Sequence, residues 1–377
     1  AELDRYPPQS VVQAINTIPG VRMEERSPSS YRLNIRGSSM RAPFGVRNVK
    51  VYFSDLPYTD PGGTTYLNQL GLLHFAGAEI VKGPGGSMYG AGTGGVVLLQ
   101  PQEGRATGFN AGYAYGSYGQ HHFFANVDWL KAGVTQNLSY QQSISDGYRE
   151  QSASDKKIVS WNGIYNVGKK VKVQSSFLFG DLHYETPGAL TLTEYETDPA
   201  GARPAAGSFP SAAAARAAID QKMVWYGISA ETRIAEGLSN KTGVYASYVT
   251  LKNPAIRNYA VTLQPHGGFR TVFHLERPLA AALLHINAGA EAQTGTSSIE
   301  VSNNNAGIPG ALQSSEDIKA TQGFVFIQGS LAYREWTLLL GASLNTLSID
   351  YSRRFPSPAI SWQRSFGNNI MPRIVLS

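Results

Sequence analysis

The stretch EIVKGPGGSMYGAGTGGVVLLQP, from Glu79 to Pro101, decides the fold of the first part of the chain. It places seven glycines among the thirteen residues 83–95, between two strand-like apolar runs. The letters GAGTGG at 90–95 fit the G-x-G-x-x-G spacing of a dinucleotide-binding loop, but such a loop needs a helix after it, where N–H groups hold the pyrophosphate. Here the strand-like run VVLLQP follows. We therefore interpret the stretch as a tightly turning connection between two strands, not as a nucleotide site.

Composition narrows the class of protein. The chain has 377 residues, no cysteine, 16% charged residues, 20 tyrosines and 40 glycines. The absence of cysteine excludes disulfide scaffolds and thiolate metal sites. The net charge is +5 with scattered Lys and Arg residues, so nucleic acid is not expected as a partner. No apolar run approaches about eighteen residues and no signal peptide is recognisable, so we expect no transmembrane helix.

The first 104 residues mix helical and strand patterns. Apolar residues repeat at helical spacing from Val11 to Ile18, and alternation at 31–36 and 49–53 predicts short strands. A second helical piece is expected near Thr65 to Leu73. Residues 1–104 are therefore predicted to form a compact α+β domain.

From Arg105 onward the pattern has a period of two. Apolar residues alternate with polar or small ones, as in 123–129 and 336–345. An antiparallel sandwich also alternates, but several runs here reach about ten residues, the length that crosses a bilayer as a tilted strand. Aromatic residues near the ends of these runs suggest interfacial girdles, namely Tyr113, Tyr115, Trp129, Trp161, Tyr165, Trp225, Tyr226 and Trp336.

The connections between these runs alternate in length. Tight turns are expected near Lys131, Lys169, Glu236, Arg277 and Arg334, and longer polar segments between them, at 145–155, 181–222, 252–267, 295–319 and 351–368. Only the first outer connection, GSYGQ, breaks the rule. Short periplasmic turns and long extracellular loops are typical of an outer-membrane barrel.

We count about twelve strands over residues 105–377. The last, NNIMPRIVLS, stops at Ser377. An open edge in lipid would leave a row of backbone N–H and C=O groups without partners. Residues 105–377 are therefore expected to be the N-terminal part of a larger transmembrane β-barrel.

Four motifs, taken in order, resemble the plug domain of TonB-dependent outer-membrane receptors. They are IPGV at 18–21, LNIRGSS at 33–39, VKVYFSDLPY at 49–58 and AEIVKGPGGSMYGAGTGGVVLLQP at 78–101. A looser likeness to ferric-siderophore and ferric-citrate receptors lies in YETPGALTLTEYETDPAGARPA at 184–205. Ser54 and Asp55 stand where the family usually has Asp-Gly, so we expect that turn to be reshaped.

The resemblance implies a plug inside a barrel of the 22-stranded type, in the bacterial outer membrane and surrounded by its lipid. It implies active import of a ferric siderophore or similar ferric chelate, driven by a TonB-type energy-coupling protein through an N-terminal segment that precedes this chain. Iron would travel as the chelate, so we expect no intrinsic cofactor and no metal site. An enzyme is not expected, because no nucleophile elbow or other catalytic set is present.

Other transport functions stay open. A haem receptor is one, because four histidines lie near outer connections: His121, His122, His183 and His266. Another TonB-dependent nutrient receptor, a surface adhesin or binding barrel, and a passive porin are the remaining alternatives. A porin has no separate N-terminal α+β domain.

We expect ligand contacts at plug turns that point outward and in the outer loops. The candidates are Arg41, Phe44, Tyr58, Thr59, Tyr184 and Arg203. A guanidinium such as that of Arg41 matches the oxygens of an anionic chelate, although a plug-to-wall ion pair is the alternative. A plain packing role is the preferred interpretation of five plug glycines: Gly37, Gly83, Gly85, Gly86 and Gly90. Buried arginines need partners, so barrel acids are expected to pair with Arg22, Arg26, Arg32 and Arg36.

Overall fold

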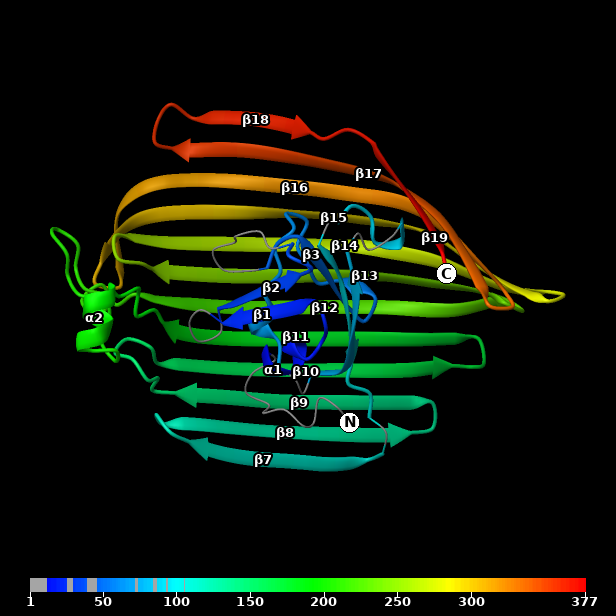
Figure 1. Cartoon of the computed structure of the whole chain (residues 1–377), viewed down its shortest axis with the longest axis horizontal. Helices are drawn as coiled ribbons and strands as arrows, with labels where there is room; N and C mark the ends of the chain where they lie inside the picture. Colours follow the sequence, from blue (N-terminus) through cyan, green and yellow to red (C-terminus); the bar gives the residue numbers. More distant parts are fainter. Residues whose placement is uncertain are drawn as a thin grey trace.

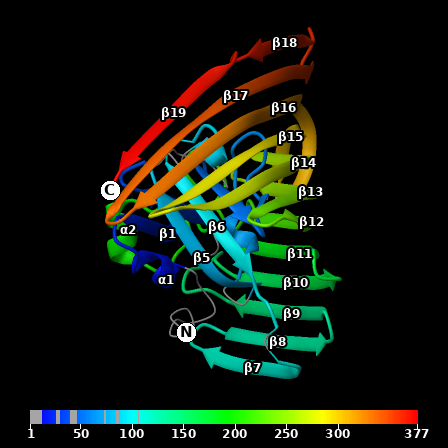
Figure 2. The ribbon, with the colours of Figure 1, turned by 90° about the vertical axis from the view of Figure 1, so that its right-hand side faces the viewer.

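A computed structural model describes residues 12–25, 30–38, 46–71, 74–83, 87–92, 94–104 and 106–377. Two small sheets in the first 104 residues lie on the concave face of one large curved sheet (Figures 1 and 2). We refer to the described part of residues 12–104 as the N-terminal unit.

The N-terminal unit contains short elements only. A helix and a hairpin come first: α1 (Val12–Asn16), β1 (Val21–Glu25) and β2 (Tyr31–Ile35). A mixed four-stranded sheet has the order β4-β3-β6-β5, with bounds β3 (Val49–Phe53), β4 (Leu56–Pro57), β5 (Phe75–Lys82) and β6 (Gly95–Pro101). Strand β6 runs parallel to β3 and antiparallel to β5. The predicted strands at 31–36 and 49–53 are therefore present.

Two 3-10 turns replace longer helices. The first, η2 (Leu67–Gln69), lies where a helix was predicted over 65–73; within the part of that segment that is described, only this turn is helical. The second, η4 (Ser87–Tyr89), lies inside the glycine-rich stretch between β5 and β6. That stretch ends at Gly95, whose φ is +141° and where a Cβ would stand 2.6 Å from the carbonyl oxygen of Val81. A side chain cannot be placed there, which explains the glycine at the start of β6.

The large sheet contains thirteen strands joined in chain order. They are β7 (Gly108–Gly116), β8 (Gln120–Lys131), β9 (Val134–Ser145), β10 (Ser154–Val167), β11 (Val171–Glu185), β12 (Ala218–Ala235), β13 (Leu238–Pro254), β14 (Asn258–Leu279), β15 (Ala282–Asn305), β16 (Ile308–Tyr333), β17 (Trp336–Phe355), β18 (Ile360–Ser365) and β19 (Asn369–Leu376). Strands β18 and β19 pair with successive parts of β17, so they share one position beside it. The predicted all-β antiparallel sheet of about twelve positions is confirmed.

The two faces of the large sheet reverse the usual polarity of a soluble protein. On β17, Leu338, Leu340 and Leu344 are exposed on the convex face, whereas Ser343 and Asn345 are buried on the concave face. The same alternation is clear on β12 and β13, where Val224, Tyr226, Val244 and Tyr248 are exposed. An apolar outer face and a polar inner face are the signature of a barrel surrounded by lipid. Among the described residues, no helix has the length and apolarity needed to span a bilayer.

One predicted girdle residue lies on the inner face instead. Trp225 is fully buried; its ring packs edge-on against Phe53 at 5.5 Å, and its Nε1–H donates to the carbonyl oxygen of Pro57 at 3.2 Å. Its neighbour Tyr226 points outward and is 42% exposed. Successive side chains on a strand face opposite ways, so only one of two adjacent aromatics can belong to a girdle.

The five predicted tight turns lie together at one end of the sheet, which we call the short-turn end. They connect the strands at 132–133, 168–170, 236–237, 280–281 and 334–335, as predicted. The opposite, long-loop end carries the segments 146–153 and 186–217, the latter with helix α2 (Leu192–Thr197). The large loops predicted at 252–267 and 295–319 are wrong, because β13 to β16 remain paired and leave connections of only 255–257 and 306–307. Continued ladder hydrogen bonds satisfy the backbone there.

Candidate functional site

A cavity of about 480 Å³ opens between the N-terminal unit and the wall on the side of the long-loop end. From the N-terminal unit it is lined by Arg47, Asp60 and Tyr66, among others. From the wall come side chains of β14 and β15, notably Gln264, His266 and Ser297. We call this space the outer cavity.

A tight turn of the N-terminal unit forms the floor of the outer cavity. The Asp60 carboxylate accepts the Thr64 N–H at 2.8 Å, and the Asp60 carbonyl accepts the Gly63 N–H at 2.9 Å. Pro61 lies against β15, since a Cβ on Gly295 would be 3.1 Å from its ring. Burial raises the pKa of Asp60 to about 6, against smaller lowering effects of its hydrogen bonds and of Arg47. This acid is therefore partly neutral near pH 6.

The wall of the outer cavity carries a few polar side chains, including Gln264 and Ser297, among apolar residues such as Leu251 and Ile299. The Tyr66 hydroxyl donates to Oε1 of Gln264 at 2.8 Å, and Nε2 of Gln264 donates to Ser297 Oγ at 3.3 Å. The buried Nε2 of His266 finds no hydrogen-bond partner among the described residues. Such a lining can exchange hydrogen bonds with an oxygen-rich guest.

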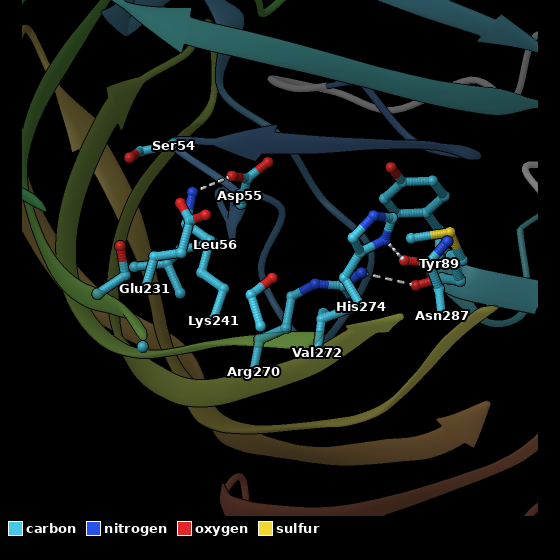
Figure 3. Close-up of a pocket in the computed structure, with 14 residues that line it drawn as sticks. Ser54, Asp55, Leu56, Tyr89, Glu231, Lys241, Arg270, Val272, His274 and Asn287 are labelled. Atoms are coloured by element: carbon cyan, nitrogen blue, oxygen red, sulfur yellow. Dashed lines mark hydrogen bonds and ion pairs between the residues drawn. The ribbon is translucent and has the colours of Figure 1, made fainter. Parts of the chain in front are cut away.

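A second space lies on the opposite side of the N-terminal unit, at the short-turn end. This inner cavity of about 310 Å³ is bordered by the β3–β4 turn and by β13, β14 and β15 (Figure 3). At its edge Lys241 forms an ion pair with Asp55 (Figure 3). Ser54 and Asp55 have φ values of +54° and +66°, so the turn is left-handed at both central residues. Ser54 and Asp55 thus form a two-residue hairpin turn without glycine, in the geometry that Asp-Gly also favours; whether it differs from the family's turn stays a prediction.

A buried charge network joins the unit to the wall between the two cavities. Arg270 Nη1 donates to Oε2 of Glu291 at 2.7 Å, with side-chain exposures of 5% and 1%. Arg270 Nη2 donates to the carbonyl oxygen of Met88 at 2.8 Å, and Tyr52 donates its hydroxyl to Glu291 Oε2 at 3.0 Å. Burial and the Glu291 carboxylate raise the pKa of Tyr52 well above its usual range. The pair comes entirely from β14 and β15, and the N-terminal unit supplies a carbonyl and a hydroxyl.

Residues 1–97 match the family model described as TonB-dependent Receptor Plug Domain. The chain carries a TonB-dependent receptor plug. Solved structures of outer-membrane receptors and transporters have the same fold as this chain, so the predicted fold class is confirmed, and the family model bears out the predicted resemblance of the N-terminal unit. The family is one of receptors rather than of enzymes.

Three solved structures illustrate the likeness. The ferric citrate transporter FecA is 14% identical with a TM-score of 0.83, and the match covers 97% of this chain and 57% of FecA. The ferric yersiniabactin uptake receptor FyuA from Yersinia pestis is 11% identical with a TM-score of 0.74, covering 97% of this chain and 58% of FyuA. The copper transporter OprC is 14% identical with a TM-score of 0.72, covering 98% of this chain and 57% of OprC. This chain spans little more than half the length of each.

Two predicted ligand residues of the plug lie inside its core. Tyr58 is 4% exposed and donates its hydroxyl to the carbonyl oxygen of Tyr66 at 3.0 Å. Thr59 is equally buried; its Oγ1 accepts the Val51 N–H at 2.7 Å and shares a hydrogen bond with Thr65. The next residue, Asp60, is the one that reaches the outer cavity. The turn residues DPGG at 60–63 follow one residue after the motif VKVYFSDLPY and are the signal in the sequence for this turn.

The two predicted loop and strand residues also have structural partners. Tyr184 is 2% exposed and packs with Leu182, Ile219 and Leu251. Arg203 donates from Nη1 to the carbonyl oxygen of Pro210 at 2.9 Å, within the 186–217 loop. Neither lines the outer cavity.

Several predicted residues lie outside the described part of the chain, namely Arg41, Phe44, Gly85, Gly86 and Arg26. Of the described glycines, Gly37 and Gly83 have positive φ values. Gly90 lies against the wall: a Cβ there would stand 2.7 Å from a ring carbon of Phe324.

The ion pairs predicted between plug arginines and barrel acids take another form. Arg22 pairs with Glu24 on its own strand at 2.9 Å, and both side chains are exposed. The buried Nε of Arg32 finds no hydrogen-bond partner within the described ranges. The buried arginine that joins plug and wall is Arg270 of the barrel. Its partner, 21 residues along the chain, is set by strand register.

The four histidines considered for haem are dispersed. His121 bonds to Tyr113, His122 to Ser143, and His183 to Asp220. Of the four, only His266 lines the outer cavity.

Proposed function

We propose that this protein is an outer-membrane active transporter that binds a ferric chelate in the outer cavity and imports it with TonB-coupled energy. The observation that carries the proposal is a plug packed into the concave face of a barrel sheet, with a cavity above it at the long-loop end whose lining includes Arg47, Gln264 and Ser297. In this account the long-loop end faces the cell exterior and the short-turn end faces the periplasm.

The lining of the outer cavity suits a ferric chelate. Ferric citrate and ferric catecholates present oxygen atoms and carry negative charge, and the cavity offers the Tyr66–Gln264–Ser297 chain and the Arg47 guanidinium. The raised pKa of Asp60 reduces the repulsion that a full carboxylate would exert on an anionic guest. Binding there would need no intrinsic cofactor.

Import requires that the plug move, because it fills the concave face of the sheet. The plug is held by the Arg270–Glu291 network, by the Trp225–Pro57 hydrogen bond and by apolar packing of Phe53 against the wall. Such contacts exceed thermal energy many times over. An external source of work, supplied through a TonB-type protein, accounts for their release.

Haem is the second candidate cargo, because the unpartnered Nε2 of His266 lies beside the outer cavity. Imidazole nitrogen is a common haem ligand.

The test measures binding to the full-length gene product in detergent, by isothermal titration with ferric citrate, a ferric hydroxamate, a ferric catecholate and haem. Ser297→Trp places a large ring into the outer cavity. Thr294→Trp, three residues away and exposed, is the matched control. We expect one ferric chelate to bind, Ser297→Trp to weaken that binding at least tenfold, and Thr294→Trp to leave it unchanged.

Each other result decides against some part of the proposal. Binding of haem alone would replace the ferric chelate as cargo. Binding that survives Ser297→Trp would remove the outer cavity as the site, and no binding of any of the four ligands would contradict the proposed function.

A further inference from the structure

Three side chains with metal-binding groups meet on the inner face of β14 and β15, near the short-turn end. The Nδ1 atom of His285 lies 3.6 Å from Oε2 of Glu276, and Nε2 of His274 lies 4.0 Å from the same oxygen. One ligand atom from each residue falls within 4.8 Å of the others. From the sequence no metal site is expected, because iron would travel as the chelate. In the structure, strand pairing brings His285 beside His274 and Glu276.

We propose that His274, Glu276 and His285 bind one divalent first-row metal ion of the Zn²⁺ or Cu²⁺ type. Two imidazoles and one carboxylate suit these ions better than Mg²⁺ or Ca²⁺, which prefer oxygen ligands alone. Bonds of about 2.0–2.2 Å to a shared ion place neighbouring donors roughly 3–3.5 Å apart. The donors therefore need to approach one another by at most about 1–2 Å, which rotation of half-exposed side chains supplies.

The backbone of the site is fixed by the ladder between the two strands. Glu276 lies opposite His285, and His274 lies opposite Asn287 in the same register. Side chains two residues apart on a strand share a face, so His274 and Glu276 point the same way. The site therefore rests on paired strands and not on a loop.

Asn287 orients one of the ligands. Its Oδ1 lies 2.8 Å from Nδ1 of His274 and can only accept a hydrogen bond, so Nδ1 carries the proton (Figure 3). The lone pair of Nε2 is then free on the side of Glu276. A polar partner on the far nitrogen of a metal-binding histidine is the usual arrangement in metalloproteins.

The open coordination positions face solvent-accessible space. His274 and Glu276 border a cavity of about 450 Å³ at the short-turn end, whose lining includes the basic residues Lys170 and Arg233. With three protein ligands, a bound ion keeps room for water or for an anionic donor, which these basic side chains favour. The site lies on the opposite side of the plug from the outer cavity, so it does not depend on the proposed chelate.

The experiment uses the full-length gene product, made without a histidine tag, stripped of metal with a chelator and titrated with Zn²⁺ and then Cu²⁺. We expect one ion per chain. His285→Asn, His274→Asn and Glu276→Gln should each weaken binding at least tenfold, and Asn287→Leu by about tenfold to a hundredfold. His183→Asn is the matched control, because His183 is similarly half-exposed and bonded to Asp220, at the long-loop end. It should bind as the unaltered protein does.

The Cu²⁺ form adds a spectroscopic readout. Its electron paramagnetic resonance spectrum should show two nitrogen ligands, and one after His285→Asn. Three results would each overturn the proposal. One is that His183→Asn weakens metal binding as much as His285→Asn does. The others are a stoichiometry well below one ion per chain and a two-nitrogen spectrum that persists in His285→Asn.

Discussion

Removing one member of the Arg270–Glu291 pair should destabilise the protein more than removing both. The pair is almost completely buried, so water and salt screen it little. In Glu291→Leu the Arg270 guanidinium stays buried with the Met88 carbonyl as its remaining hydrogen-bond acceptor among the described contacts. An uncompensated buried charge costs about 3–5 kcal/mol.

The same substitution also leaves the Tyr52 hydroxyl and the Gln293 amide without their acceptor. Each unsatisfied buried donor adds about 1–3 kcal/mol. The double variant Arg270→Met/Glu291→Leu keeps this second cost but removes the uncompensated charge. It should therefore be about 3 kcal/mol more stable than Glu291→Leu alone.

The assay is guanidinium unfolding of the full-length gene product in detergent micelles, followed by tryptophan fluorescence. A control cycle on the exposed pair, Arg22→Met and Glu24→Leu, should show a coupling below about 1 kcal/mol. If the double variant is as unstable as the sum of the single variants, or if the exposed pair couples as strongly, the reasoning about burial is refuted.

Three further predictions concern the plug. Gly90→Ala should cost at least about 2 kcal/mol, because φ is +65° and the new Cβ would meet Phe324 at 2.7 Å. Gly92→Ala should cost less than about 1 kcal/mol in the same unfolding assay, because the new Cβ would make only an ordinary contact with Lys50 at 4.0 Å. Burial raises the pKa of Asp60 from 3.8 to about 6. Its protonated form therefore stabilises the fold below pH ~4, and this contribution is lost as pH rises through about 6. Asp60→Asn should abolish this pH dependence, which amounts to up to about 3 kcal/mol in the free energy of unfolding measured from pH 4 to 7. Ser54→Gly should raise stability by about 1 kcal/mol, because a non-glycine residue at φ +54° is strained, and a melting temperature that falls would contradict this.

The sequence was sufficient for the fold because two strong periodic signals agree with it. Alternation from Phe123 to Trp129 and from Trp336 to Asn345 reflects lipid on one side and the lumen on the other, and the glycine-rich stretch marks the plug. The short turns followed from the same pattern. The long loops predicted at 252–267 and 295–319 were wrong, because polar strands that stay paired beyond the bilayer have the composition of loops.

The candidate site was far less accessible from sequence. Tyr58 and Asp60 are only two residues apart, and only the turn geometry shows that the acid reaches the outer cavity while the tyrosine enters the core. The partners Gln264 and Ser297 come from different strands, whose register no local pattern specifies. The same holds for Arg270 and Glu291. Long-range pairing, rather than residue type, decides which polar groups meet.

The most direct test of the proposed function is uptake of radiolabelled ferric chelates by iron-starved cells that carry the full-length gene, with and without a protonophore. The account predicts uptake of one ferric chelate that the protonophore abolishes. Release of the plug needs energy from the proton-motive force, which a protonophore dissipates. Uptake that continues unchanged in the protonophore would mean a passive channel and would contradict the account.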